Sequence, residues 1–407
     1  MASCLLSIST EAHTFDAQFH PSEPILAMAT VTGEVEVHRF DLVGGTSEVV
    51  RKIASHEDSC RTARFLGAAT GAQSASSSSF AQASSASSAA LMIATASADC
   101  FTALSDLETG KRVWRSKLPG AGNALLPLAG SDRFVVGDDS GGVLLFDSRD
   151  KKLAASWSEN ADFISDMALG VDGYSLCATS GDGTLAVYDL RKNGVKGLIA
   201  MSDFQEDELL SVAIVKGGKK VVCGSQTGIL SIFSWGDFGD QKDRIKGHPM
   251  SVDAMLKLTE EGLLTGCSDG KIRVVATNAK NLQHGVMGVL AEHGDFPIEQ
   301  LALSPDGKLL ASVSHNQPAV KLWSTEAAHQ LLSGEVEKKQ AAEGEDAQGA
   351  EVDSDDSDED TAPNRKARRR QQQKEKQAKK RARKGGTNHN SVVKETKQKA
   401  GSFFGGL

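Results

Sequence analysis

Basic side chains are densely clustered between residues 364 and 384, which read NRKARRRQQQKEKQAKKRARK. The cations considered for contact with RNA, or for an import signal, are Arg365, Lys366, Arg368, Arg369, Arg370, Lys379, Lys380, Arg381, Arg383 and Lys384. Clustered Arg and Lys neutralise phosphates, so RNA binding here would weaken steeply with salt. No aromatic residue is interleaved with them, which argues against base stacking and sequence readout. An import signal without RNA contact is the alternative interpretation, and both stay open.

An acidic segment precedes this cluster and ends in DSDDSDED. Acidic residues outnumber basic ones between residues 335 and 360, and the balance reverses from 365 to 399. Ser354 and Ser357 lie inside the acidic run, a setting that suits acid-directed kinases. Their phosphorylation would add negative charge and strengthen masking of the basic cluster. At the end of the chain, Phe403, Phe404 and Leu407 form an apolar hook that would dock in a partner's groove or fold back.

Motifs that would indicate catalysis are missing from the sequence. No phosphate-binding G-x-x-x-x-G-K-[ST] loop, G-x-S-x-G elbow, H-E-x-x-H helix or C-x-x-C pair occurs. His13 and His20 have no Cys or acidic residue at metal-ligand spacing. The six Cys are scattered singly and are expected to be small buried residues. The sequence therefore predicts a protein that is not an enzyme, with no cofactor, no metal and no small-molecule substrate.

The chain has 407 residues, 40% of them apolar, and a formal net charge of −8. It contains no apolar run of about 18 residues, so no transmembrane helix is expected and membranes are not among the expected partners. The N-terminus lacks the basic start and the apolar stretch of a signal peptide. Unpaired cysteines fit a reducing, intracellular compartment.

Repeats organise most of the sequence. The stretch from Ala161 to Arg191 reads as three strands joined by turns at Asp172-Gly173 and Asp182-Gly183. Its second turn recurs roughly every 42 to 47 residues after a longer first gap. The copies are Thr32-Gly33, Ala98-Asp99, Ser140-Gly141, Asp182-Gly183, Thr227-Gly228, Asp269-Gly270 and a degraded Asn316-Gln317. The long gap contains a Ser/Ala-rich insertion at 67–90, which is expected to be a loop between two strands.

This period, with several strands in each unit, resembles the WD40 repeat. The segment from Leu301 to Trp323, LALSPDGKLLASVSHNQPAVKLW, is one such unit. Only the unit that opens at Gly247 is expected to keep both the His and the Asp of the family's polar network, as His248 and Asp269. Seven units predict an all-β fold, a seven-bladed β-propeller. The strand at 3–9 is expected to close the ring onto the last blade, which removes exposed edges.

The predicted domain organisation has four parts. The propeller is expected at 1–332, with the low-complexity loop at 67–90 inside it. An acidic, disordered linker at 333–363 and a basic segment at 364–400 follow, and the apolar hook occupies 401–407.

Four segments narrow the resemblance to one family. They are GDDSGGVLLFDSR, FISDMALGVDGYSLCATSGDG, GKKVVCGSQTGILSIFSWGDFG and the terminal SFFGGL. Together they resemble the WD repeat-containing protein 55 family, which includes fungal ribosome-biogenesis relatives. The resemblance implies a non-catalytic scaffold of the nucleus and nucleolus that acts in ribosomal RNA processing and large-subunit assembly. Its implied partners are pre-ribosomal assembly proteins, with pre-ribosomal RNA through the basic segment, and the protein is expected to be a monomer.

A second function stays open. The strand ends Phe146-Asp147-Ser148-Arg149 and Tyr188-Asp189-Leu190-Arg191 resemble the WD-x-R ending that some WD40 proteins present to the DDB-type adaptor of cullin ubiquitin ligases. Candidate docking residues are Asp147, Arg149, Asp189 and Arg191. Such residues are also ordinary at the end of this strand, so the pattern alone does not separate an adaptor site from plain structure.

Overall fold

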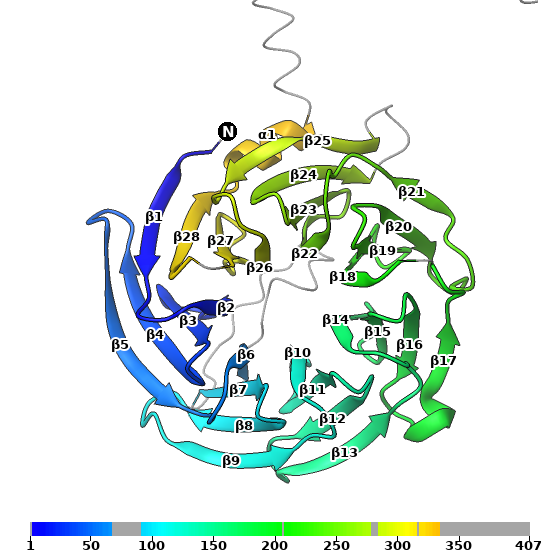
Figure 1. Ribbon diagram of the computed structural model, residues 1–407, viewed down its shortest axis with the longest axis horizontal. Helices are drawn as coiled ribbons and strands as arrows, with labels where there is room; N and C mark the ends of the chain where they lie inside the picture. The colour runs from blue at the N-terminus through cyan, green and yellow to red at the C-terminus, as the bar shows by residue number, and fades with distance from the viewer. Residues whose placement is uncertain (1, 67–90, 206, 278–283, 316, 334–407) are drawn as a thin grey trace, which may run out of the picture. The chain divides into compact units, whose positions relative to one another are not determined.

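The computed structural model describes residues 2–66, 91–205, 207–277, 284–315 and 317–333. Seven four-stranded antiparallel sheets stand around a central axis, as the blades of a propeller do (Figure 1). The seven-bladed all-β prediction is therefore confirmed. Among the described residues, no helix is long and apolar enough to cross a membrane.

The blades follow one another along the chain, and in each of blades one to six the strands run in sequence order from the axis outward. Blade one contains β2 (Thr14–Phe19), β3 (Ile25–Thr30), β4 (Glu34–Asp41) and β5 (Thr46–Ala54). Blade two contains β6 (Cys60–Leu66), β7 (Met92–Ser97), β8 (Phe101–Asp106) and β9 (Arg112–Lys117). Blade three contains β10 (Gly122–Pro127), β11 (Arg133–Asp138), β12 (Val143–Asp147) and β13 (Lys152–Trp157).

The remaining blades continue the same order. Blade four contains β14 (Ile164–Leu169), β15 (Ser175–Ser180), β16 (Leu185–Asp189), the 3-10 helix η1 (Gly194–Gly197) and β17 (Leu198–Met201). Blade five contains β18 (Leu209–Val215), β19 (Lys220–Ser225), β20 (Leu230–Ser234) and β21 (Asp243–Ile245). Blade six contains β22 (Val252–Thr259), β23 (Gly262–Cys267), β24 (Lys271–Thr277) and β25 (His284–Glu292). Blade seven contains β26 (Ile298–Leu303), β27 (Leu309–Ser314), β28 (Ala319–Ser324) and, as its outer strand, β1 (Cys4–Ser9).

The first strand of the chain closes the ring. Strand β1 pairs antiparallel with β28, so that Leu6 lies opposite Leu322 and Ile8 opposite Val320. The predicted closing strand at 3–9 is thereby confirmed. Figure 1 shows β1 beside β28, at the seam where blade seven meets blade one. Because every blade then has two neighbours, the ring is closed and has no open end.

Both faces of each sheet are covered, which explains the long apolar runs in the second strands. Strands β3, β15 and β23 are buried at every position. The core between blades three and four shows why: Val135 and Leu145 of one blade share a cluster with Leu176 and Tyr188 of the next. A strand between two packed layers needs apolar residues on both sides, so the alternation of a half-exposed strand is lost.

The predicted second turns lie between the second and third strands of the blades. Gly33, Gly141, Gly183 and Gly270 have φ values of 83°, 78°, 78° and 73°, the left-handed region that favours glycine. In blade two Cys100 takes this place with φ of 61°. The blade-seven turn includes residue 316, which lies outside the described residues. The insertion at 67–90 also lies outside them, and its flanking strands β6 and β7 pair directly, as expected.

The expected distribution of the polar network was wrong. Blade two contains a His–Asp pair, since His56 Nδ1 lies 3.0 Å from Asp99 Oδ2. In blade six, His248 instead contacts the hydroxyl of Thr265. Asp269 accepts hydrogen bonds from Arg273, with 2.9 Å between Arg273 Nη1 and Asp269 Oδ1. The sequence could not reveal the blade-two pair by local spacing, because the insertion separates its two members.

The helix α1 (Glu326–Ser333) follows β28 and lies along blade six, beside β25 (Figure 1). Leu331 and Leu332 pack into a core cluster that also contains Val274 of β24 and Leu290 of β25. The helix therefore covers apolar surface of blade six that its own strands leave open.

Candidate functional site: the mouth of the central channel

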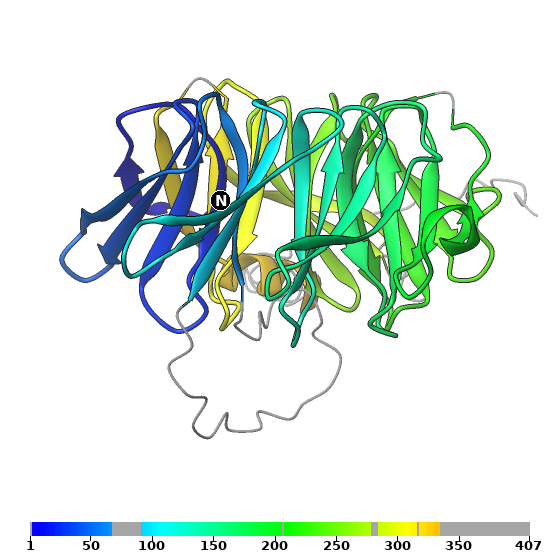
Figure 2. The ribbon, with the colours of Figure 1, turned by 90° about the horizontal axis from the view of Figure 1, so that it is seen from below.

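Each innermost strand contains one extra residue at the same place, directly after its first paired residue. These seven residues form the bulge ring, and the end of the propeller on which they lie is the bulge face. They are Phe15, Arg61, Asn123, Ser165, Leu210, Asp253 and Glu299. A β-bulge of this kind re-aims a side chain, and all seven residues line one cavity of ≈ 130 Å³. Figure 2 shows the propeller from the side, with its two faces above and below.

The channel below the bulge ring is narrow. A second cavity of ≈ 80 Å³ is lined by residues of blades two to seven, such as Leu126, Met167, Val212 and Met255. Pockets that hold drug-sized ligands have volumes of roughly 300 Å³ or more. Side chains therefore fill most of the described channel. A depression of ≈ 380 Å³ lies over part of the bulge ring, beside Arg61 and Asp253, but it is open to solvent and so is better suited to surface contacts than to enclosing a small molecule.

Charged residues of the bulge ring are held by neighbours. Arg61 Nη1 lies 3.1 Å from Asp139 Oδ1 and also donates to the amide of Asn123. Asp253 accepts hydrogen bonds from the hydroxyls of Ser251 and Ser268, at 3.1 and 2.7 Å. Burial raises the pKa of Asp253 above its ordinary value. These bonds fix the directions in which the ring presents its polar groups.

One layer deeper, carboxylates connect adjacent blades. Asp16 Oδ2 accepts from the hydroxyl of Thr62 at 2.8 Å and from the backbone N–H of Ala63 at 3.0 Å. It also pairs with Arg64. Asp166 accepts from the backbone N–H of Val212 at 2.9 Å. We interpret these groups as structural, because they form blade-to-blade bonds.

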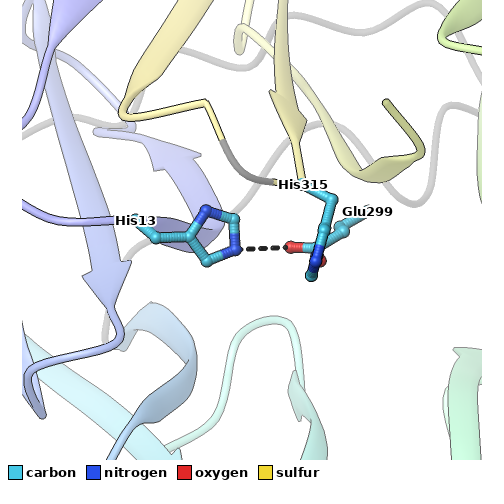
Figure 3. Close-up of side chains that lie close together, drawn as sticks. All are labelled: His13, Glu299 and His315. Atoms are coloured by element: carbon cyan, nitrogen blue, oxygen red, sulfur yellow. Dashed lines mark hydrogen bonds and ion pairs between the residues drawn. The ribbon is translucent and has the colours of Figure 1, made fainter. Parts of the chain in front are cut away.

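Glu299 of the bulge ring and two histidines meet at the rim of the mouth and form the rim trio. His13 Nε2 lies 3.4 Å from Glu299 Oε2, and His315 Nδ1 lies 2.5 Å from Glu299 Oε1 (Figure 3). The sequence offered no metal-like spacing for His13, because these partners come from the last blade. His20, the other histidine considered, accepts from the backbone N–H groups of Ser22 and Glu23 at 3.2 and 2.9 Å. It therefore acts as a turn-forming residue.

The loops of the bulge face are acidic. They run from each outermost strand to the next innermost strand, and from each second strand to the third. Their described acidic residues are Glu11, Glu57, Asp58, Asp99, Asp139, Glu159, Asp162, Asp182, Asp203, Asp207, Glu208, Asp269 and Asp295. Lys246 is the one Lys or Arg in the described part of these loops. Phosphate groups are repelled by such a surface, whereas a basic protein surface is attracted.

The residues predicted for adaptor docking lie on the opposite face of the propeller. Arg149 follows β12 of blade three and Arg191 follows β16 of blade four. Arg149 donates to both oxygens of Asp147, at 3.1 and 2.8 Å, and Arg191 to both oxygens of Asp189, at 2.8 and 2.9 Å. These bonds hold the pKa of each Asp well below its ordinary value. The guanidinium groups remain accessible, since the side chains are 64% and 59% exposed.

Comparison with known proteins decides the family. The chain is 37% identical over 334 residues to WD repeat-containing protein 55 of Arabidopsis thaliana, a match that covers 81% of this chain and 84% of that protein. It is 32% identical over 317 residues to WD repeat-containing protein 55 of Homo sapiens, covering 78% and 75%. It is 33% identical over 321 residues to WD repeat-containing protein JIP5 of Cryptococcus neoformans, covering 78% and 80%. The chain belongs to the WD repeat-containing protein 55 family. No family model matches it.

Membership in the WD repeat-containing protein 55 family makes the propeller a WD-repeat scaffold, a fold that serves protein–protein interaction. The remaining predicted sites of this family member lie outside the described residues. They are the phosphorylation candidates Ser354 and Ser357, the basic cluster from Arg365 to Lys384, and the hook residues Phe403, Phe404 and Leu407. The bulge ring and the rim trio were not predicted, because the ring is assembled from all seven blades and the trio joins blade seven to the loop that leads into blade one.

Proposed function

We propose that this chain is a non-catalytic scaffold in ribosome biogenesis, acting in ribosomal RNA processing and large-subunit assembly in the nucleolus. Family membership supports the proposal, because it is the function that the sequence resemblance implies. The observation that carries it is a separation of charge. An acidic bulge face on a rigid ring is joined in the same chain to a segment with clustered Arg and Lys between 364 and 384.

The acidic face and the basic segment suit different partners. The acidic bulge face disfavours nucleic acid and favours a protein with a basic surface. The basic segment suits the phosphates of RNA. When one of two linked segments is bound, the other is held at a high effective concentration near its own site. Even a weak RNA contact would therefore raise the overall affinity of the chain for an assembly particle. The same chain would then position a pre-ribosomal protein beside pre-ribosomal RNA.

Affinity purification of three versions of the chain tests this function. The first version is full length, the second ends at Ser333, and the third ends at Ser333 but has an unrelated nuclear import signal added. We expect pre-ribosomal RNA and assembly proteins with the full-length chain. The third version should recover the proteins and lose the RNA. If it recovers both, the basic segment serves import alone. Absence of ribosomal precursors from all three versions would contradict the proposed function.

Charge reversal tests the role of the bulge face. Asp203→Lys with Asp295→Lys changes two exposed residues of its loops, and we expect loss of the assembly proteins. The matched control is Glu108→Lys with Asp150→Lys, which changes two exposed residues in loops of the opposite face. Equal recovery of partners with both variants would show that the acidic face is not the docking surface.

A second function, a substrate receptor of a cullin-type ubiquitin ligase, is favoured by one observation. Arg149 and Arg191 present oriented guanidinium groups on the face opposite the bulge face, on neighbouring blades. Arg149→Ala with Arg191→Ala should abolish pull-down of a DDB-type adaptor and leave ribosomal precursors bound. Arg39→Ala is the matched control, since Arg39 is a half-exposed arginine in β4, paired with Glu23. Failure of the wild-type chain to recover an adaptor would contradict this second function.

A further inference from the structure

The rim trio has the composition and the spacing of a metal site. His13, Glu299 and His315 each offer one ligand atom, and these atoms all lie within 4.8 Å of one another. Figure 3 shows the imidazole of His13 facing the Glu299 carboxylate, and the side chain of His315 beside the same carboxylate. The three residues come from the loop before β2, from the bulge of β26 and from the turn after β27. The fold therefore brings His13, near the start of the chain, beside two donors of the last blade.

Two members of the trio have buried polar atoms that make no hydrogen bond in the described structure: both ring nitrogens of His13 and the Oε2 of Glu299. His13 Nε2 and Glu299 Oε2 face each other at 3.4 Å, the distance of an ion pair. The side chains are 17% and 22% exposed. Buried polar atoms normally have partners, and an unpaired one costs about 1–3 kcal/mol. A ligand bound at this point would supply the bonding partners that these buried polar atoms lack.

The chemistry of the donors selects the class of ligand. Imidazole and carboxylate together suit Zn²⁺ and related first-row divalent metals, whereas Mg²⁺ and Ca²⁺ prefer oxygen donors alone. Tetrahedral Zn²⁺ with bonds of about 2.0–2.1 Å places its ligand atoms about 3.3 Å apart. The pair of His13 Nε2 and Glu299 Oε2, at 3.4 Å, already has this separation. His315 Nδ1 must move away from Oε1, and its side chain is 48% exposed, so it has room to do so.

We propose that His13, Glu299 and His315 bind a divalent transition metal of the Zn²⁺ class, which clamps blade seven to blade one. The ligands lie on the two sides of the seam where the ring closes, and β1 is the strand that otherwise holds this seam. A cross-link between residues so distant in the sequence constrains the unfolded chain, as a disulfide over a long loop does. Three protein ligands leave one tetrahedral position for water. This inference rests on the propeller alone and does not depend on the ribosomal function.

The test uses the tag-free, full-length chain after treatment with a chelator. Zn²⁺ itself is the probe, titrated by calorimetry in competition with a chromophoric chelator. We expect one tight equivalent with the wild type. His13→Ala and His315→Ala should each weaken that equivalent at least tenfold, and Glu299→Gln should also weaken it. His329→Ala is the matched control, because His329 is an exposed histidine in α1, away from the trio, and should leave the titration unchanged.

Thermal unfolding supplies a second readout. Zn²⁺ should raise the Tm of the wild type and of His329→Ala, and should leave the Tm of His13→Ala and His315→Ala where it is without metal. Circular dichroism must show that each variant keeps its strands, and the half-exposed His315 is the safer position in this respect. The proposal is overturned if no tight equivalent binds, or if binding is the same in all three histidine variants.

Discussion

Asp166 of β14 accepts a hydrogen bond at 2.9 Å from the backbone N–H of Val212 in β18, and so connects blade four to blade five. Burial is the main cause that raises the pKa of Asp166 to about 6. Asp16 plays the same part between blades one and two, through Ala63. These side-chain bonds tie the innermost strands of blades one and two, and those of blades four and five, to each other.

The raised pKa of Asp166 predicts a dependence of stability on pH. Between its ordinary pKa of 3.8 and about 6, the folded protein holds a proton that the unfolded chain has released. The contribution of this group to the free energy of unfolding is therefore full at low pH and falls as pH rises through that window, by up to about 3 kcal/mol. The difference between the urea midpoints at pH 4 and pH 6 should therefore be smaller for Asp166→Asn than for the wild type.

Asp58→Asn, in an exposed loop of the bulge face, is the matched control for this measurement. The control should follow the wild-type pH profile. Should Asp166→Asn also follow it, then Asp166 titrates at its ordinary value and the inferred burial effect is wrong.

Two glycines with the same backbone angle should respond differently to substitution. Gly270 has φ of 73° and Gly307 has φ of 72°, so alanine is strained at both, by roughly 1–2 kcal/mol. An added Cβ at Gly270 would collide with the backbone carbonyl of Gly294, whereas one at Gly307 meets nothing within 4 Å. We expect Gly270→Ala to lower the free energy of unfolding by at least about 2 kcal/mol more than Gly307→Ala. Urea unfolding measures both values. If the two variants lost equal free energy of unfolding, the loop that contains Gly294 would have to move aside without an energetic penalty.

The closing strand offers a matched pair within one element. Ile8 of β1 is fully buried against blade seven, and Leu5 of the same strand is 42% exposed. Ile8→Ala should cost about 2–5 kcal/mol, because it leaves a cavity at the seam, and Leu5→Ala less than about 1 kcal/mol. Urea unfolding monitored by tryptophan fluorescence measures both. A small loss for Ile8→Ala would show that β1 contributes little to ring closure.

The repeat architecture was predictable because its signals are local. A left-handed turn favours glycine, so the period is visible in residues such as Gly33, Gly183 and Gly228. The closing strand was predictable by a general argument, since an open ring would expose two edges. Predicting those features needs only the residues next to one another in the sequence, or the general rule that the ring must close.

The site was less predictable because its parts come from separate blades. A single extra residue in β26 makes Glu299 part of the bulge ring, and no residue type in that strand indicates a bulge. His13 approaches Glu299 only after the first and last blades meet, whereas His315 reaches Glu299 within blade seven, across the pairing of β26 with β27. The His56–Asp99 pair was missed for a similar reason, as the insertion obscures the alignment of its repeat with the others.

The basic segment should give RNA binding a strong dependence on salt. Removing one phosphate contact lowers the slope of log Kd against log salt by about 0.7 for single strands. Arg368, Arg369 and Arg370 changed together to Gln should therefore lower the slope by up to about 2. Filter binding of a single-stranded RNA across a salt series measures it. The control changes Gln371, Gln372 and Gln373 to Ala and should keep the wild-type slope; an unchanged slope for the arginine variant would exclude this cluster from RNA contact.

Phosphorylation of the acidic run should oppose the same binding. Ser354 and Ser357 lie between acidic residues and precede the basic cluster, so added phosphate would strengthen the masking of its cations. Treatment with an acid-directed kinase should weaken RNA binding by the wild-type chain several-fold. Ser354→Ala with Ser357→Ala should be insensitive to the kinase, and Ser391→Ala, a serine outside the acidic run, should respond as the wild type does. If the double variant loses affinity on kinase treatment as strongly as the wild type, the two serines do not control the basic segment.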